Sequence, residues 1–327
     1  MHKVALAGAG GIGKKHLDCY RQIDTAQVVA VIEPEEEAAE AARRNGYPVF
    51  ASLDDAINMT SPDILDITAP TPFHKDLTLQ GLKAGMHILL EKPMARTLED
   101  CDTIIEAVEQ SGRRLMVGHV LRFFPEFVRA RNAVMSGEVG SPAMVRTSRG
   151  GAFPGTPSSW YANLNVSGGV LLDLVIHDFD WLRWTFGEVE RVFSQGLAAS
   201  RPWARDYSLT SLRFSSGVIA HVEGTWMRHG GFRASFEVAG DRGLLQYDSR
   251  DAATLAVASG QTQGLRLESP LYQTPQYRQI THFLNCLQTG EDTLVSMTDA
   301  REAVRISLAA LESVKTGKPV TLAEGGR

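Results

Sequence analysis

Short apolar runs alternate with amphipathic segments from the start of the chain to about residue 120. The apolar runs predict strands that are buried on both faces, at residues 3–8, 27–33, 48–50, 63–69, 86–91 and 114–118. The segments between them have helical spacing, at residues 11–22, 35–45, 73–84 and 97–111. This alternation predicts an α/β domain with a doubly wound parallel sheet, whose ligands bind beyond the carboxyl ends of the strands.

The pattern changes after residue 120. Helical spacing covers residues 123–136, 171–186, 275–288 and 298–316, and strand-like stretches between turn signals cover residues 191–198, 209–214, 218–226, 234–239 and 243–247. Strands grouped in this way predict an α+β domain, built on a mostly antiparallel sheet with helices on one face. We therefore expect two domains, residues 1–120 and 121–327, with C-terminal helices that can pack back on the first domain.

The turn after the first predicted strand contains G-x-G-x-x-G at Gly8, Gly10 and Gly13. Gly8 permits a tight turn, Gly10 lets the backbone approach a pyrophosphate, and Gly13 allows helix and strand to pack closely. The helix that begins at Gly11 and Ile12 then offers backbone N–H groups to phosphates. A motif of this kind on its own also fits a Gly-rich turn in another α/β protein.

Glu33 ends the second predicted strand, 20 residues after Gly13, which is about where a ribose-binding acid belongs. Its presence favours dinucleotide binding. Pro34 and three glutamates follow directly, and the nearest arginines, Arg43 and Arg44, come further along the next helix. A 2′-phosphate would meet negative charge there, so we expect NAD to be preferred over NADP.

The composition limits the partners. The formal net charge is −5, which gives no basic surface for nucleic acid. No apolar run approaches the ~20 residues of a membrane span, and the first predicted strand begins too early to leave room for a signal peptide. The three cysteines are far apart and odd in number, which is typical of reduced thiols in the cytoplasm, and no metal-ligand spacing is present.

Two further strand ends face the expected ligand crevice. Pro70 and Thr71 form a turn after the fourth long strand, where Thr71 can donate to a cofactor. His74 opens the next helix, where a surface or capping role competes with a ligand role. Glu91 and Lys92 end the fifth strand, and Lys92 can donate to a ribose hydroxyl and stabilise a developing alkoxide. A charged strand end without function is the alternative.

A strongly apolar helical segment contains Asp173, His177 and Asp180. Asp173 and His177 are four residues apart, so we expect them to share one face of a helix. A structural Asp–His pair in a core helix is one interpretation. Because a hydride cofactor is expected elsewhere in the chain, His177 is also the natural proton acceptor, with Asp173 orienting its ring or binding a substrate hydroxyl.

These motifs together resemble the Gfo/Idh/MocA oxidoreductase family over essentially the whole chain. The matches are the opening G-x-G-x-x-G, Thr71-Pro72 with His74, Glu91-Lys92-Pro93, Gly118 through Arg122-Phe123 and Pro125, and D-x-x-x-H-x-x-D at Asp173, His177 and Asp180. The resemblance implies a Rossmann domain, an open-faced α/β domain with a large sheet, and assembly as a homodimer or homotetramer, often through that sheet. The predicted sheet itself has no second layer of helices for its far face, which also favours an interface.

By this resemblance, Lys92 is the catalytic lysine that also touches the nicotinamide ribose, and Asp173 and His177 contact the reacting carbinol. The sequence departs from the family pattern at four places. Phe73 and His119 stand where asparagine is frequent, and Val170 and Val175 replace common glycines. These departures remove no catalytic group but leave the substrate geometry open.

We expect the substrate pocket between the crevice and the second sheet, with the candidate residues His119, Arg122, Phe153, Trp160 and Tyr161. The leading hypothesis is an NAD(P)-dependent dehydrogenase acting on a CH–OH group of a sugar, cyclitol or related polyol. One alternative is an enzyme that cleaves glycosidic bonds by transient oxidation with a retained NAD. The other is a nucleotide-sensing regulator without catalysis, against which the presence of Lys92, Asp173 and His177 argues.

Overall fold

The structure is a computed structural model, and it describes residues 1–327 except 157–158, 198–205, 252–254, 259–264, 269–272 and 323–327. The chain divides into two compact units. The first comprises Met1–Phe123 and Gln273–Arg301, and the second comprises Phe124–Tyr272 and Glu302–Arg327. A segment near the C-terminus thus belongs to the same unit as the N-terminal region.

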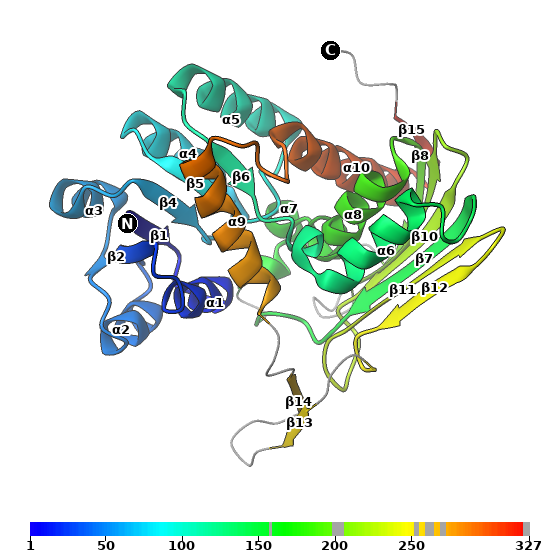
Figure 1. Cartoon of the computed structure of the whole chain (residues 1–327), viewed down its shortest axis with the longest axis horizontal. Helices are drawn as coiled ribbons and strands as arrows, with labels where there is room; N and C mark the ends of the chain where they lie inside the picture. Colours follow the sequence, from blue (N-terminus) through cyan, green and yellow to red (C-terminus); the bar gives the residue numbers. More distant parts are fainter. Residues whose placement is uncertain (157–158, 198–205, 252–254, 259–264, 269–272, 323–327) are drawn as a thin grey trace. The chain divides into compact units, whose positions relative to one another are not determined.

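The first unit contains a six-stranded parallel sheet, which confirms the predicted doubly wound fold. Its strand order is β3-β2-β1-β4-β5-β6, so the order reverses between β1 and β4, where such sheets bind ligands. Figure 1 shows α4 and α5 on one face and α1 and α9 on the other. The elements are β1 (His2–Ala7), α1 (Gly11–Tyr20), β2 (Ala26–Ile32), α2 (Glu36–Arg44), β3 (Val49–Phe50), α3 (Leu53–Thr60), β4 (Ile64–Ile67), η1 (Thr71–Phe73), α4 (His74–Lys83), β5 (His87–Leu90), α5 (Leu98–Ser111), β6 (Leu115–Val117), η2 (Val120–Phe123) and α9 (Pro275–Thr289).

Helix α3 is absent from the sequence prediction. Only Leu53 and Ala56 of this short helix are buried, so its apolar pattern is too weak to indicate a helix. Its start is nevertheless well defined, because the Ser52 side chain accepts a hydrogen bond from the backbone N–H of Asp55 at 3.2 Å. A side-chain acceptor at this position satisfies one of the N–H groups that a helix leaves unpaired.

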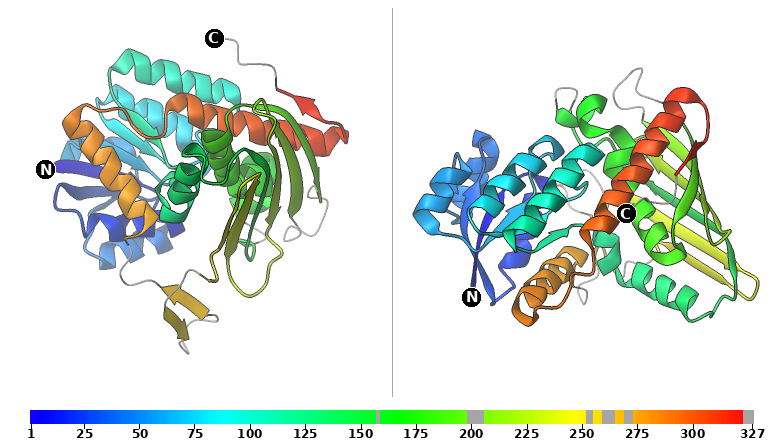
Figure 2. Two further views of the ribbon diagram at one scale, coloured as in Figure 1. Left: turned by 45° about the vertical axis from the view of Figure 1, so that its right-hand side comes forward. Right: turned by 90° about the horizontal axis from the view of Figure 1, so that it is seen from above.

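The second unit contains a seven-stranded sheet with the order β12-β11-β7-β10-β9-β8-β15. Neighbouring strands are antiparallel except for β7 and β10, so the predicted mostly antiparallel sheet is confirmed with one parallel pair. Both views in Figure 2 show helices against one face of this sheet. The elements are α6 (Pro125–Met135), β7 (Pro142–Gly150), η3 (Trp160–Ala162), α7 (Leu164–Ser167), η4 (Val170–Leu174), α8 (Ile176–Phe186), β8 (Val189–Gly196), β9 (Tyr207–Phe214), β10 (Ile219–Thr225), β11 (Arg233–Gly240), β12 (Leu244–Asp248), β13 (Leu255–Ala258), β14 (Leu265–Glu268) and β15 (Val320–Thr321), and α10 (Met297–Thr316) runs from the first unit into the second.

Strand β7 lies in the middle of the sheet, yet the sequence pattern did not indicate it. Its covered face carries Val145, Thr147 and Arg149, all buried, so polar residues interrupt the apolar alternation. Arg149 is accommodated by an ion pair, in which its Nε lies 2.7 Å from Asp178 Oδ2 on α8. Both side chains are almost fully buried, and the pair therefore connects the sheet to the helix layer.

An aromatic cluster fills the space between the helices and the sheet of the second unit. The Trp181 ring on α8 lies 5.1 Å from the rings of Phe127 on α6 and Phe236 on β11. Its indole N–H donates to the Phe127 carbonyl at 3.1 Å, so the polar atom of this fully buried side chain is satisfied. This core holds α8, the helix that carries His177, against the sheet.

We expect Asp178→Ala to lower the free energy of unfolding of the second unit by about 3–5 kcal/mol, because it leaves the buried Arg149 guanidinium without its charge partner. All five tryptophans lie within residues 124–272, so urea titration followed by tryptophan fluorescence reports on this unit. Glu138→Ala is the control, since it removes an exposed ion pair with Arg129 and should cost less than about 1 kcal/mol. Equal effects of the two substitutions would contradict the structural role of the buried pair.

Candidate active site

The Gly-rich turn between β1 and α1 is shaped by two close backbone approaches. Gly8 has φ +98°, and a Cβ there would lie 2.6 Å from the Ala69 nitrogen. A Cβ on Gly13 would lie 2.0 Å from the Gly8 carbonyl oxygen. At Gly10 and Gly11, by contrast, a Cβ would meet nothing within 4 Å, so this side of the turn is open. The tight packing at Gly8 and Gly13 and the open space at Gly10 and Gly11 fit the approach of a dinucleotide pyrophosphate.

The start of α1 also fits an anionic ligand. The helix begins at Gly11, its N-cap Gly10 supplies no side-chain cap, and its first turn contains no acidic residue. The first N–H groups of a helix have no partner within the helix, and its dipole favours negative charge at this end. The backbone at Gly11, Ile12 and Gly13 can therefore hold phosphate oxygens.

Glu33 follows β2, and backbone N–H groups fix both oxygens of its carboxylate. Ala9 donates to Oε2 at 2.7 Å, and Glu35 donates to Oε1 at 3.0 Å. Because Ala9 belongs to the Gly-rich turn, the acid and the turn are held in one arrangement. The side chain is half-buried, which leaves the carboxylate accessible to a ribose hydroxyl.

Glu91 and Lys92 follow β5, at the same edge of the sheet as the Gly-rich turn. Glu91 Oε2 accepts a hydrogen bond from the backbone N–H of Lys92 at 3.3 Å, and Gln279 on α9 donates to Oε1 at 3.5 Å. Burial opposes ionisation of Glu91, but a hydrogen bond and the positive charge of His16, together with the charge of Lys92, outweigh it and lower the pKa of Glu91. The carboxylate therefore stays charged beside the lysine backbone.

His16 is a residue of this region that the sequence analysis missed. It lies on α1, three residues after Gly13, and is fully buried. Its Nδ1 lies 2.8 Å from Asp66 Oδ2 on β4, and its Nε2 lies 3.4 Å from Glu91 Oε1. The sequence did contain a signal for this residue. A histidine on the inner face of the helix after the Gly-rich turn indicates polar groups nearby, because a buried imidazole needs polar partners.

The turn after β4 places Thr71 and His74 as buried residues. His74 Nε2 lies 2.9 Å from the Ala69 carbonyl oxygen, and Nδ1 lies 2.8 Å from the Pro93 carbonyl oxygen. Burial lowers the pKa of His74, although both carbonyls favour its charged form. The ring thus joins two loops at the ligand edge, and the expected cofactor contacts of Pro70, Thr71 and His74 stay predictions.

In the second unit, Asp173 and His177 do not lie in one regular α-helix, so the predicted continuous helix over residues 171–186 is interrupted, and their shared face stays a prediction. Asp173 lies in the π-helical turn η4, where the backbone N–H of Val175 donates to the Val170 carbonyl at 2.9 Å, and His177 lies in α8. A π turn holds one more residue than an α turn, so it changes the direction of the side chains that follow it. Such turns are frequent at functional sites.

His177 is the one residue between Ser167 and Leu182 that is not buried. Asp173 in the preceding turn is 9% exposed, and Asp178 and Asp180 are each 1% exposed. A ring that reaches solvent from an otherwise buried segment is available to exchange a proton with a ligand. This arrangement is compatible with an acid/base role for His177.

Asp206 supports the start of this segment and was also missed. Its Oδ2 accepts a hydrogen bond from the backbone N–H of Val170 at 2.7 Å, and a Cβ on Gly169 would lie 2.6 Å from the same oxygen. Burial and the charge of Asp173 raise the pKa of Asp206, although the Val170 hydrogen bond lowers it. Asp206 directly precedes β9 and lies far along the chain from the π turn, so no local sequence pattern connects the two.

The predicted substrate residues are divided between the two units. His119 follows β6 and is buried, and the Arg122 Nη1 donates to the Leu294 carbonyl at 2.9 Å and to Asp299 at 3.0 Å within the first unit. In the second unit the rings of Trp160 and Tyr161 lie 4.0 Å apart and are half-buried, and Phe153 is also half-buried. The substrate contacts expected for these residues stay predictions.

The chain matches known protein families and relatives over most of its length. Residues 2–119 match the model described as oxidoreductase family, NAD-binding Rossmann fold, and residues 127–246 match the GFO/IDH/MocA C-terminal domain. The inositol 2-dehydrogenase of Rhizobium meliloti (strain 1021) is 30% identical over 337 residues, which cover 98% of this chain and 99% of that protein. The chain belongs to the Gfo/Idh/MocA oxidoreductase family.

Solved structures agree with this membership of the Gfo/Idh/MocA family. A putative myo-inositol dehydrogenase from Sinorhizobium meliloti 1021 matches with a TM-score of 0.86 at 26% identity, covering 99% of this chain and 100% of that one. GenD2 from gentamicin A biosynthesis, solved in complex with NAD, matches with a TM-score of 0.89 at 23% identity over 99% of this chain and 97% of its own. Because GenD2 is only 23% identical, its similarity shows a shared fold and nothing more.

This Gfo/Idh/MocA protein is accordingly an NAD(P)-dependent oxidoreductase with an NAD-binding Rossmann fold. Among the residues that the structure describes, no group of three or more His, Cys, Asp or Glu side chains could hold a metal ion. A search of the same residues finds no helix with the length and apolar character that crossing a membrane requires.

Proposed function

We propose that this family member oxidises a CH–OH group of a sugar, cyclitol or related polyol with NAD, and that Lys92 and His177 are its catalytic pair. The names of its relatives support the substrate class, because the Rhizobium meliloti protein is an inositol 2-dehydrogenase. The observation that carries the assignment is the partial exposure of His177 in a segment that is otherwise buried. A buried segment with one accessible imidazole is what a proton acceptor needs.

The proposed roles follow from the chemistry of each side chain. His177 accepts the hydroxyl proton at a ring nitrogen, and Asp173 orients that ring or binds a substrate hydroxyl. The Lys92 ammonium donates a hydrogen bond to the same oxygen and stabilises its developing negative charge. NAD, when bound, supplies the hydride acceptor. The alcohol thus loses one proton to His177 and one hydride to the nicotinamide, which leaves a carbonyl group.

We expect Lys92→Ala and His177→Ala each to lower kcat by about 10²–10⁴-fold, because each removes a group that acts on the substrate oxygen. NAD affinity, measured by fluorescence titration, should persist in both variants. Lys83→Ala is the control, since this exposed lysine lies at the end of α4. A kcat near that of the wild type in either active-site variant would contradict the assignment.

Net accumulation of NADH separates the proposed oxidation from a transient one. A dehydrogenase that releases its product and cofactor should raise the absorbance of NADH in proportion to the polyol consumed. A panel of inositols, sugars and sugar acids, assayed with NAD, identifies the substrate by kcat/KM. Consumption of a glycoside without any net NADH would instead favour the glycosidic-bond-cleaving alternative.

We further propose that Glu33 makes NAD the preferred cofactor. Its carboxylate is already fixed by Ala9 and Glu35, so it cannot turn away from a 2′-phosphate without breaking two backbone hydrogen bonds. The exposed Glu35, Glu36 and Glu37 follow, and the nearest arginine, Arg43, is paired with Glu36 at 2.8 Å and Glu40 at 3.3 Å. A phosphate would therefore approach net negative charge.

We expect the wild type to show a higher kcat/KM with NAD than with NADP, and Glu33→Ser to reduce or invert that ratio. Glu33→Gln is the matched variant, because it keeps the size of the side chain and removes only its charge. Both substitutions should raise kcat/KM for NADP relative to NAD. Equal use of the two cofactors by the wild type, or an unchanged ratio in both variants, would assign the preference to another residue.

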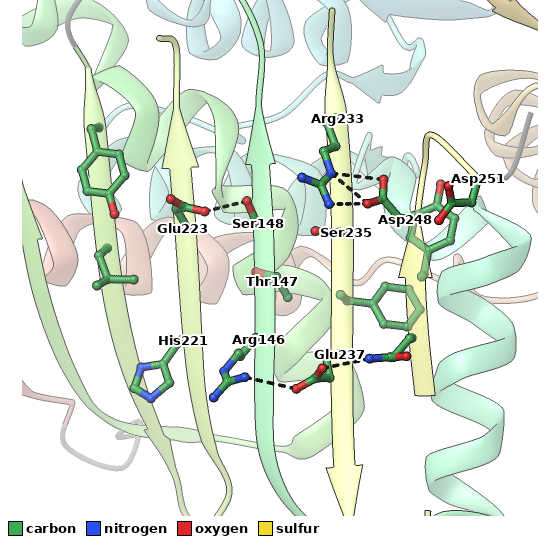
Figure 3. Close-up of a pocket in the computed structure, with 15 residues that line it drawn as sticks. Arg146, Thr147, Ser148, His221, Glu223, Arg233, Ser235, Glu237, Asp248 and Asp251 are labelled. Carbon is green, nitrogen blue, oxygen red and sulfur yellow. Dashed lines mark hydrogen bonds and ion pairs between the residues drawn. The ribbon is translucent and has the colours of Figure 1, made fainter. Parts of the chain in front are cut away.

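We also propose that the protein is a homo-oligomer, a homodimer or homotetramer, joined through the open face of the seven-stranded sheet. The face opposite the helices holds a hollow of about 820 Å³ (Figure 3). An uninterrupted row of apolar residues crosses four strands in register on this face: Ile219, Met144, Ala239 and Leu244. Ile219 and Leu244 are 44% and 51% exposed, as expected of a surface that a second copy covers.

Most residues that line the hollow beside this row are polar, and Leu209 on β9, which is 40% exposed, is an apolar exception. On β10 the alternation places Ala220 and Val222 on the covered face, where both are buried, and Ile219 on the open face. In Figure 3 Arg146 pairs with Glu237 at 3.4 Å, and Ser148 donates to Glu223 at 2.7 Å. Cross-strand pairing satisfies these groups within one copy, which reduces the cost of covering them.

Light scattering at micromolar concentration should give a mass of at least two chains. Ile219→Asp should lower that mass, because it places an unpaired charge at the β10 end of the apolar row, where the second copy is expected to cover it. Met59→Asp is the control, since Met59 is 75% exposed on α3 in the other unit and its substitution should leave the mass unchanged. A monomeric wild type would exclude the interface.

A further inference from the structure

Two buried histidines contact the residues on either side of Lys92. His16 on α1 lies 3.4 Å from the carboxylate of Glu91, which precedes the lysine. His74 at the start of α4 lies 2.8 Å from the carbonyl oxygen of Pro93, which follows it. The two histidines are 0% and 1% exposed, so neither can contact a substrate. Any part they take in catalysis must act through the segment between them.

On the first side, His16 lies between two carboxylates. Its Nδ1 lies 2.8 Å from Asp66 Oδ2, which also accepts a hydrogen bond from the Tyr20 hydroxyl at 3.0 Å. Asp66 is 0% exposed on β4, and a carboxylate in that position needs a positive partner. Burial opposes charge on His16, but the charges and hydrogen bonds of Asp66 and Glu91 outweigh it and raise the pKa of His16 to about 10. The ring is therefore an imidazolium at neutral pH.

The charge on His16 fixes Glu91, and Glu91 fixes the lysine backbone. One carboxylate oxygen faces His16 and accepts from Gln279, and the other accepts from the N–H of Lys92. Gly118, which follows the neighbouring strand β6, leaves the space that this carboxylate occupies, because a Cβ there would lie 2.5 Å from Glu91 Oε1. In this position both carboxylate oxygens of Glu91 have polar partners, and the charge of His16 compensates its charge.

On the second side, His74 connects Pro93 to the loop after β4. Its two ring nitrogens lie between the carbonyl oxygens of Pro93 and Ala69, at 2.8 and 2.9 Å. Ala69 also packs directly on Gly8, where a Cβ would collide with its backbone. The loop that supports the Gly-rich turn and the segment that carries Lys92 are therefore joined by one side chain.

We propose that His16 and His74 are positioning residues that hold Glu91 and Pro93 and so fix the backbone from which Lys92 reaches the substrate. The proposal rests on the proposed catalytic role of Lys92. A fixed backbone matters because displacing a catalytic group by about 1 Å can cost about 10²-fold in rate. A purely structural role would lower stability and leave kcat unchanged. Measuring both quantities therefore distinguishes a positioning role from a structural one.

The kinetic test uses His16→Gln, which keeps an amide donor for Glu91 but removes the positive charge. We expect kcat to fall by about 10²-fold, with the KM for NAD and the NAD dissociation constant close to the wild type. Leu82→Ala is the matched control, because it destabilises the same unit through the buried face of α4 and touches none of these groups. A kcat for His16→Gln that is no lower than that of Leu82→Ala would overturn the proposal.

A double-substitution cycle with Lys92→Ala tests whether His16 acts through the lysine. Single-turnover rates should show that adding His16→Gln to Lys92→Ala costs much less than it costs in the wild type, because the two residues act as one unit. Full additivity would overturn the proposal. An active Lys92→Ala protein would instead refute the proposed catalytic role, so the two failures are distinguishable.

For His74 the matched variants are His74→Asn and His74→Ala. The asparagine amide can place a donor near the position of Nδ1 and retain the contact with Pro93, whereas alanine cannot. We expect His74→Asn to keep a larger fraction of kcat than His74→Ala, at similar NAD affinity. Equal kcat values in the wild type and both variants would exclude a positioning role for this residue.

The charge state of His16 can be measured in the wild-type protein, so this test requires neither an activity assay nor a variant whose folding could be impaired. The charged groups that act on the ring are Asp66 and Glu91, the Cys19 thiol lies within reach of its charge, and Tyr20 contacts Asp66. Nitrogen NMR of the wild-type protein with labelled histidine should show one imidazolium that persists at pH 8 and is lost only near pH 10. If every histidine in the wild type became neutral below pH 8, the imidazolium between Asp66 and Glu91 would be excluded, and with it the role proposed for His16.

Discussion

A carboxylate in the middle of a parallel sheet is the constraint on which the ligand edge of the first unit depends. Asp66 on β4 is inaccessible to solvent, and its partners in register on the two neighbouring strands are Leu6 and Leu89. Such a charge requires compensation, and His16 supplies it from α1. The same imidazolium then compensates Glu91, whose second oxygen holds the backbone of Lys92. One buried charge thus couples the helix of the dinucleotide turn to the proposed catalytic lysine.

The sequence predicted the first unit well because its interactions are local and repetitive. Parallel strands covered on both faces are continuous apolar runs, and Gly8 and Gly13 are required by backbone contacts that no other residue permits. Glu33 could be found from its spacing to the turn. His16 was not found, because the reason for a histidine at that position lies on β4 and β5, which are distant in sequence.

In the second unit, the features that the sequence did not predict share one cause. They depend on contacts between residues distant in sequence, which no local pattern of apolar and polar residues indicates. Strand β7 carries Thr147 and Arg149 on its covered face, and only the ion pair with Asp178 makes that acceptable. The π turn was read as part of an α-helix because nearly every residue around it is apolar, so no periodicity marks the extra residue. Asp206 stabilises that turn from another part of the chain.

The π turn has a consequence for how substrate specificity can change in this fold. An α-helix rotates by about 100° per residue, so removing Leu174, the residue of the π turn that follows Asp173, would turn everything before it by about that angle relative to α8. Asp173 would then point in a new direction, while α8, which carries His177, stayed held by the contact between Trp181 and Phe127. The angle between the two side chains is therefore set by chain length rather than by residue identity. Under the roles proposed for Asp173 and His177, an insertion or deletion at this turn would change the geometry in which the two side chains meet a carbinol.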